Sequence, residues 1–159
     1  MAERIPMTAE GRAKVQEELS RLKSVERSKI VKEIEAARGH GDLSENAEYH
    51  AAKERQGHVE SRIRLLEDYL ARAEVIDISR IDGSRVVFGV TVRLVDVNND
   101  QELTYRIVGD LESDLQKGLI SVNSPIAKAL IGKEVGDQVT VQVPGGRREL
   151  EITEIQVKA

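Results

Sequence analysis

The first half of the chain repeats apolar residues at the three- and four-residue spacing of an amphipathic helix. Thr8 is the predicted N-cap of the first helix, because it follows Pro6 and precedes the first apolar position. The apolar positions of this helix are Val15, Leu19, Leu22, Ile30, Ile34 and Ala37. The stripe changes phase between Leu22 and Ile30, so we predict a bend or stutter at the polar residues Glu26–Lys29.

A second helix carries a heptad-like seam. The seam positions are Ala52, Gln56, Val59, Ile63, Leu66, Leu70 and Ala73. Two segments of about 30 residues, joined by a few turn residues, predict an antiparallel helical hairpin that reaches roughly 45 Å. Each helix has one narrow apolar stripe, so the helices bury each other and leave their other faces in water. We therefore expect residues 1–75 to form a protruding coiled-coil arm.

The second half alternates apolar and polar residues in the manner of β-strands. The runs VVFGVTVRLVDV and ELTYRIVG flank a turn signal at residues 98–100. A short helix capped by Ser124, with Pro125 in its first position, precedes a closing hairpin with its turn at Pro144–Gly146. After a linker that starts at Val75, residues 76–159 are predicted to form a compact α+β domain with an antiparallel sheet.

Composition narrows the class of protein. Of the 159 residues, 40% are hydrophobic and only 3% are aromatic, so the core must be aliphatic. The absence of cysteine excludes disulfides, thiol catalysis and cysteine metal sites. No stretch resembles a signal peptide or a membrane span, and we expect a cytoplasmic protein with no membrane partner. The net charge of −4 excludes a surface that grips nucleic acid all over, although a local basic patch remains possible.

Candidate chemistry is concentrated between the two helices, in GHGDLSENAEYHAAK (residues 39–53). Asp42 and Glu45 are three residues apart at the point where the second helix restarts. They have the spacing of a capping box, with Asp42 as N-cap and Glu45 at the third helical position. Two such carboxylates at the end of an exposed arm could also converge on a Mg²⁺ ion, provided that another molecule contributed further ligands. The two interpretations are compatible.

Other polar residues near the predicted turn have weaker patterns. His40, His50 and His58 are spaced too widely for a zinc site of the i, i+4 type. Arg38 and Lys53 flank the turn, where they could contact a phosphate backbone or remain solvated. Tyr49 could pack on the turn or stack on a base. The chain shows no pairing of a nucleophile with a base.

Several segments resemble one family: IPMT, HGDLSENAEYHAAKE, TYRIVG, LISVNSPIAKALIGK and VPGG. Together they are similar to the Gre family of bacterial transcript cleavage (elongation) factors, from Ile5 to the final strand. GDLSENAEY is a specific motif of that family. The modest basic content near the turn is similar to the GreA branch of the family rather than to GreB.

The resemblance implies a function. Gre factors bind backtracked bacterial RNA polymerase, insert the hairpin through its secondary channel and stimulate the polymerase's own cleavage of the nascent RNA 3′ end. They are not enzymes themselves. The family's two essential acids fall on Asp42 and Glu45, which would hold a catalytic Mg²⁺ only within the polymerase active site. Its basic residues fall on Arg38 and Lys53, which would contact RNA.

The same resemblance implies an FKBP-like C-terminal domain that docks on the polymerase rim through an apolar patch, and we expect a monomer. The chain departs from the family pattern at Gly39, where a charged residue is common and where a glycine could end the first helix. Lys53 replaces the usual Arg.

Three alternatives remain. A Gre-like regulator could enter the channel and inhibit the polymerase, and an unrelated coiled-coil adaptor could have the same helices. A chaperone or prolyl isomerase is the third, but its pocket needs aromatic residues and the chain offers only Phe88, Tyr105 and Tyr69.

Overall fold

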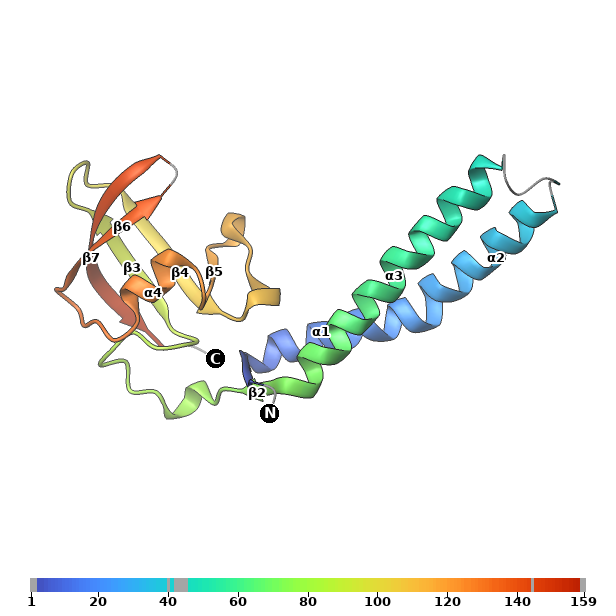
Figure 1. Ribbon diagram of the computed structural model, residues 1–159. Coiled ribbons are helices and arrows are strands. Elements are labelled where there is room, and N and C mark those ends of the chain that lie inside the picture. Colours follow the sequence, from blue (N-terminus) through green and yellow to red (C-terminus); the bar gives the residue numbers. More distant parts are fainter. Residues whose placement is uncertain (1–2, 40, 42–45, 144, 158–159) are drawn as a thin grey trace. The chain divides into compact units, whose positions relative to one another are not determined.

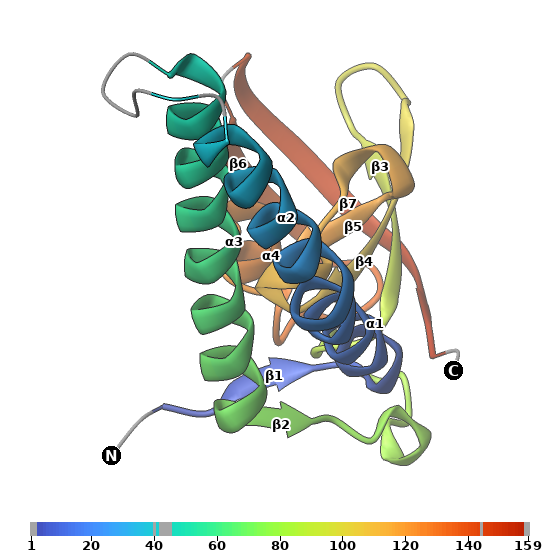
Figure 2. The ribbon, with the colours of Figure 1, turned by 90° about the vertical axis from the view of Figure 1, so that its right-hand side faces the viewer.

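The two apolar stripes of the first half bring its helices together as a hairpin. The computed structural model describes residues 3–39, 41, 46–143 and 145–157. Helices α1 (Ala9–Arg21) and α2 (Arg27–Arg38) run in one direction and α3 (Ala47–Arg72) returns beside them (Figure 1, Figure 2). The buried seam consists of Val15, Leu22, Ile30, Ile34, Ala37, Ala52, Ile63 and Leu66. The predicted helical hairpin is therefore confirmed.

The structure contains both features predicted for the first helix, its N-cap and the break in its apolar stripe. Thr8 precedes α1, and its Oγ1 accepts a hydrogen bond from the Gly11 amide at 2.9 Å, as an N-cap does. Between α1 and α2 the chain forms a π-turn, η1 (Leu22–Glu26), in which the Arg27 amide donates to the Leu22 carbonyl. A π-turn holds one extra residue, which keeps Leu22 and Ile30 on the same face. The stutter was predicted a few residues too late, at Glu26–Lys29.

Ion pairs join the two sides of the hairpin. Arg62 donates two hydrogen bonds to the Glu18 carboxylate, at 2.7 and 3.1 Å, and these bonds lower the pKa of Glu18. Arg27 binds Glu60 in the same bidentate way, at 3.0 and 2.8 Å. Two further pairs are Lys23–Glu67 and Glu33–Arg55. Each exposed pair contributes only about 0–1 kcal/mol, but together they restrict sliding of one helix along the other. None of the described helices is both long and apolar enough to span a bilayer.

The chain divides into two compact units. The arm contains Arg12–Ala73, and the sheet unit contains Arg4–Gly11 with the chain from Glu74 onward. The sheet unit has a small pair of strands, β1 (Ile5–Met7) and β2 (Ala73–Val75), so the chain is still in regular structure at Val75, where a linker was predicted.

The main sheet has the strand order β5-β4-β3-β7-β6. Its strands are β3 (Thr91–Asp96), β4 (Glu102–Val108), β5 (Leu119–Ser121), β6 (Gln138–Val143) and β7 (Gly146–Gln156). Helix α4 (Pro125–Leu130) and three 3₁₀ turns, η3 (Ile78–Arg80), η4 (Asp110–Glu112) and η5 (Leu115–Lys117), complete the unit. The predicted α+β class is confirmed.

One strand pair differs from the predicted antiparallel sheet. Strand β5 pairs with β4 in parallel, with Leu119 opposite Arg106. Between these strands the chain passes through η4 and η5, and this connection returns it to the same end of the sheet, as a parallel pair requires. The other pairs, β3–β4, β3–β7 and β6–β7, are antiparallel. Pro144, in the predicted β6–β7 turn, lies outside the described residues.

The core of the sheet unit is aliphatic, as the composition predicted. Its buried members are Val86, Val90, Val92, Leu94, Ile107, Ile120, Ala127, Leu130, Val139, Val141, Leu150 and Ile152. Phe88 and Tyr105 pack against this cluster and are partly buried. Both aromatic rings of the unit therefore belong to its core packing.

Candidate functional site

The first helix of the arm ends at Arg38, as predicted. Gly39 is the C-cap residue, and its amide donates to the Ala36 carbonyl at 3.2 Å. Its φ of −68° is right-handed, so this position does not require glycine. The left-handed conformation occurs at Gly41, with a φ of +106°.

Asn46 begins the second helix and joins it to the first. Its Oδ1 accepts a hydrogen bond from the Tyr49 amide at 3.0 Å, which makes Asn46 the N-cap of α3. Its Nδ2 donates to the carbonyl of Ala37, in the last turn of α2, at 2.5 Å. One side chain therefore satisfies polar backbone groups at both helix ends.

The capping interpretation of the two acids is consequently wrong. Because Asn46 is the N-cap, the third helical position is Tyr49, and Asp42 and Glu45 both precede the cap in the sequence. Asn caps helices about as well as Asp, and the capping-box spacing of Asp42 and Glu45 led the prediction to a residue four positions before the true cap.

Asp42, Glu45 and His40 lie outside the described residues. Their metal-binding and catalytic roles therefore remain predictions. Within the part of the chain that the structure describes, no three acidic or histidine side chains are grouped so that they could hold a metal ion. Two carboxylates are oxygen ligands of the kind that Mg²⁺ prefers, so the residue types of the motif fit that ion.

The two predicted RNA-contacting cations are both described and exposed. Arg38 is the last residue of α2; its carbonyl accepts a hydrogen bond from the Gly41 amide at 3.5 Å, and its guanidinium has no hydrogen bond or ion pair with a described residue. The Lys53 ammonium lies 3.1 Å from Gln56 Oε1, an exposed contact within α3. Neither cation has a carboxylate partner among the residues that the structure describes.

The aromatic and histidine side chains near the turn have contacts inside the arm. Tyr49 packs against the cluster of Ile30, Ile34 and Ala52, and its ring lies edge-on to His50 with a centroid separation of 5.5 Å. This packing favours a structural role for Tyr49 over base stacking. His58 is 3.7 Å from Glu54 on the exposed face of α3.

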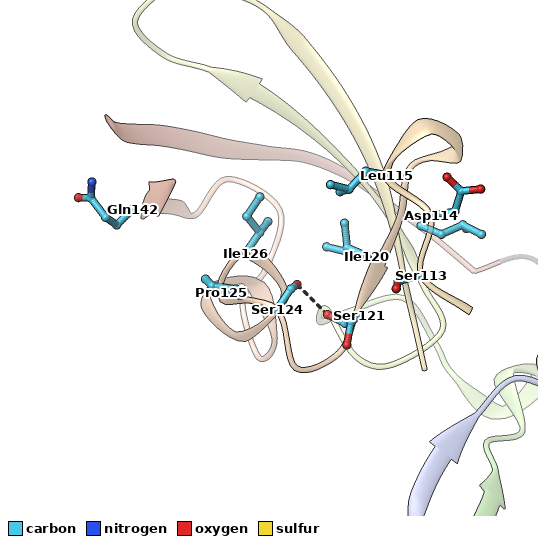
Figure 3. Close-up of a pocket in the computed structure, with 10 residues that line it drawn as sticks. Ser113, Asp114, Leu115, Ile120, Ser121, Ser124, Pro125, Ile126 and Gln142 are labelled. Carbon is cyan, nitrogen blue, oxygen red and sulfur yellow. Dashed lines mark hydrogen bonds between the residues drawn. The ribbon is translucent and has the colours of Figure 1, made fainter. Parts of the chain in front are cut away.

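The sheet unit has an apolar pocket of about 410 Å³. Figure 3 shows Leu115, Ile120 and Ile126 facing the same space. The full lining is Ser113, Asp114, Leu115, Leu119, Ile120, Ser121, Ser124, Pro125, Ile126 and Gln142. Leu115 is 74% exposed, the highest value among the large hydrophobic side chains described as exposed. A solvent-exposed leucine beside an apolar pocket is typical of a protein-binding surface.

Sequence reasoning expected an apolar patch but identified none of its residues. The available signal was Leu115, a lone apolar residue within the polar run ESDLQKG. The pocket lining contains no aromatic residue. Phe88 and Tyr105 pack on the core, and Tyr69 belongs to α3, so the structure gives the prolyl isomerase alternative no support.

Comparison with known proteins gives two family matches that together span most of the chain. The family described as Transcription elongation factor, N-terminal, matches residues 5–75, and Transcription elongation factor, GreA/GreB, C-term, matches residues 81–157. Transcription elongation factor GreA of Anaeromyxobacter sp. (strain K) is 60% identical over 153 residues, which cover 96% of this chain and 92% of the relative. GreA of Agrobacterium fabrum (strain C58) is 57% identical over 156 residues, which cover 98% of this chain and 99% of the relative.

Among solved structures, GreA factor homolog 1 (Gfh1) of Thermus thermophilus is 27% identical. The match covers 97% of this chain and 99% of that one, with a TM-score of 0.45. A superposition this loose supports no statement about mechanism.

Proposed function

Because the chain belongs to the GreA/GreB family of transcription elongation factors, we propose that it rescues RNA polymerase that has backtracked and stalled. The arm enters the secondary channel of the polymerase and stimulates the polymerase's own cleavage of the RNA 3′ end. The chain is a cofactor of that reaction and has no catalytic centre of its own. Its partners are the polymerase and the nascent RNA, and it works as a cytoplasmic monomer.

In this proposal Asp42 and Glu45 are the groups that act at the reaction centre. Enzymes that use two metal ions stabilise the leaving oxygen with one and activate water with the other. The two carboxylates would complete the oxygen ligands of a Mg²⁺ ion that the polymerase holds only weakly. Arg38 and Lys53 would hold the phosphate backbone of the displaced RNA.

The observation that supports this role is the cap at Asn46. A carboxylate that capped α3 would spend its lone pairs on backbone amides and would be a poorer ligand for a metal ion. Asn46 takes that position through its hydrogen bond from the Tyr49 amide. The motif acids are thus not required to start the helix.

The apolar pocket of the sheet unit is the surface through which we propose that the chain docks on the polymerase. Family membership supplies the partner, and the exposed Leu115 at a pocket of about 410 Å³ supplies a surface that a protein side chain could fill. Docking there would deliver the arm to the channel at a high local concentration. The pocket then sets affinity, and the arm tip sets the rate of cleavage.

The test is RNA cleavage in a backtracked elongation complex with Mg²⁺. The native chain should release short 3′ fragments, whereas Asp42→Asn and Glu45→Gln should abolish release and still compete with the native chain for the polymerase. Wild-type cleavage by the double variant would overturn the role of the acids. An inhibitory regulator would instead slow elongation and release no fragments.

The docking surface is tested separately. Leu115→Ser should raise the concentration of factor needed for half-maximal cleavage and leave the maximal rate unchanged. Val135→Ser is the matched control, because Val135 is another exposed aliphatic residue of the sheet unit, 56% exposed, that does not line the pocket. Equal behaviour of the two variants would remove the pocket from the proposal.

A further inference from the structure

We propose that Asp110 is a positioning residue that holds both walls of the docking pocket in shape, although it does not line the pocket itself. The inference rests on the proposed docking function and adds a residue to it. Asp110 is the first residue of η4, between β4 and the first wall of the pocket.

The carboxylate of Asp110 holds the turn between β5 and α4. Its Oδ1 accepts a hydrogen bond from the Ser121 hydroxyl. The side-chain amide of Asn123 donates to both carboxylate oxygens, at 3.1 and 3.0 Å. The Asn123 backbone amide in turn donates to Ser121 Oγ at 3.1 Å, which closes the group. A single carboxylate therefore holds the last residue of β5, Ser121, and the middle residue of the short connection to α4, Asn123.

That turn leads directly into the second wall of the pocket. The Ser124 hydroxyl donates to the Ser121 carbonyl at 2.7 Å, the contact drawn in Figure 3. Ser124 Oγ also accepts from the Ala127 amide at 3.2 Å, as the N-cap of α4. Pro125 and Ile126, which follow Ser124, line the pocket. Displacing Ser121 would consequently shift the start of α4.

The first wall depends on the same residue through its main chain. The Ser113 hydroxyl donates to the Asp110 carbonyl at 3.0 Å, and Ser113 lines the pocket with Asp114 and Leu115. The carboxylate and the carbonyl of Asp110 thus act on opposite walls. Asp110 thus links the segment that carries Leu115 to the turn that leads to Ile126.

These hydrogen bonds are too exposed to be a main source of global stability. Asp110 and Asn123 are both exposed, and an exposed hydrogen bond competes with water. The buried aliphatic core and the paired strands hold the unit without them. The effect of Asp110 is therefore expected in the geometry of the pocket rim, and so in affinity for the polymerase.

The experiment measures cleavage against factor concentration for Asp110→Ala and Asn123→Ala. Each variant should raise the half-maximal concentration about tenfold, because a rim without these contacts adopts the docking geometry only part of the time, with the maximal rate unchanged and the unfolding midpoint lowered no more than in the control below. Asp82→Ala is the matched control: Asp82 also accepts from a serine amide and hydroxyl, at 2.9 and 2.7 Å, but that serine, Ser84, does not line the pocket. It should bind like the native chain.

A rescue variant separates positioning from charge. Asp110→Asn combined with Asn123→Asp exchanges the amide and the carboxylate, so the hydrogen bond between them and the acceptor for Ser121 can both re-form. Recovery of affinity in this pair supports the proposal. Unchanged affinity in Asp110→Ala overturns it, and so does failure of the exchanged pair to recover. When Asp110→Ala has no effect, the Leu115→Ser variant shows which proposal has failed. If Leu115→Ser has no effect either, the docking pocket itself is refuted. If Leu115→Ser weakens binding, only the role of Asp110 is refuted.

Discussion

Replacing Asn46 with Ala should loosen the end of the arm and reduce cleavage while docking persists. The substitution removes two contacts at once: the cap that accepts from the Tyr49 amide at 3.0 Å and the hydrogen bond to the Ala37 carbonyl at 2.5 Å. Asn46 is half-buried and belongs to the arm, whereas the proposed docking surface belongs to the sheet unit.

The magnitude follows from those two contacts. Loss of an Asn N-cap costs about 1 kcal/mol, and loss of the second hydrogen bond costs about 1 kcal/mol more. A local destabilisation of about 2 kcal/mol corresponds to a roughly thirtyfold larger population of molecules in which the first turn of α3 is open. Because a site must be held within about 0.5 Å of its working geometry, a turn that is open more often should lower the maximal cleavage rate.

Hydrogen exchange at the Tyr49 amide measures the opening, and a titration with stalled polymerase gives the half-maximal concentration and the maximal rate. Asn46→Asp keeps one contact and removes the other, because its carboxylate still caps α3 but cannot donate a hydrogen bond to the Ala37 carbonyl. It should show about half of the destabilisation. Native-like exchange at Tyr49 in Asn46→Ala would refute the reasoning, as would a change in half-maximal concentration alone.

Three further changes test the physics of the fold. Gly57→Ala should raise the free energy of unfolding of the arm by about 1 kcal/mol, read from urea denaturation, because no neighbouring heavy atom lies within 4 Å of an added Cβ in the middle of α3. Asp100→Gly should stabilise the sheet unit by about 0.5–1 kcal/mol, read from its thermal unfolding, since Asp100 has a φ of 58°. Arg62 lowers the pKa of Glu18 below its ordinary value of 4.5, so this pair should stabilise the arm fully above that pH and progressively less as the pH falls through the folded-state pKa. Glu18→Gln should flatten that part of the pH profile, and an unchanged acid limb would contradict the assignment.

The helices could be predicted because their signal repeats. Each buried position of the arm supports the same three- and four-residue spacing, so a single error does not change the result. The break in phase between Leu22 and Ile30 was also visible in the sequence. Its exact position was not, because a π-turn can absorb an extra residue anywhere between two such positions.

Features decided by single contacts were harder to predict. Asp42 and Asn46 are comparable caps by type, and the choice depends on the Ala37 carbonyl, which is distant in sequence. The direction of β5 depends on the path through η4 and η5. The pocket brings together Leu115, Ile120 and Ile126 from three segments, and no spacing along the chain encodes that meeting. Family resemblance named the acids of the motif; periodicity alone could only locate the turn.

The π-turn has a consequence for how this hairpin can lose a residue. Removing Ser24 would convert Leu22–Glu26 into ordinary α-helix and leave every downstream seam residue facing its present partner. A single deletion, which normally turns the rest of a paired helix away from its neighbour, would here leave the packing unchanged. Because the extra residue is taken up within one wider turn, the far end of the helix would also keep its place. The number of residues in this helix can therefore vary by one at this point, and an evolving or engineered chain could use that freedom without disturbing the seam.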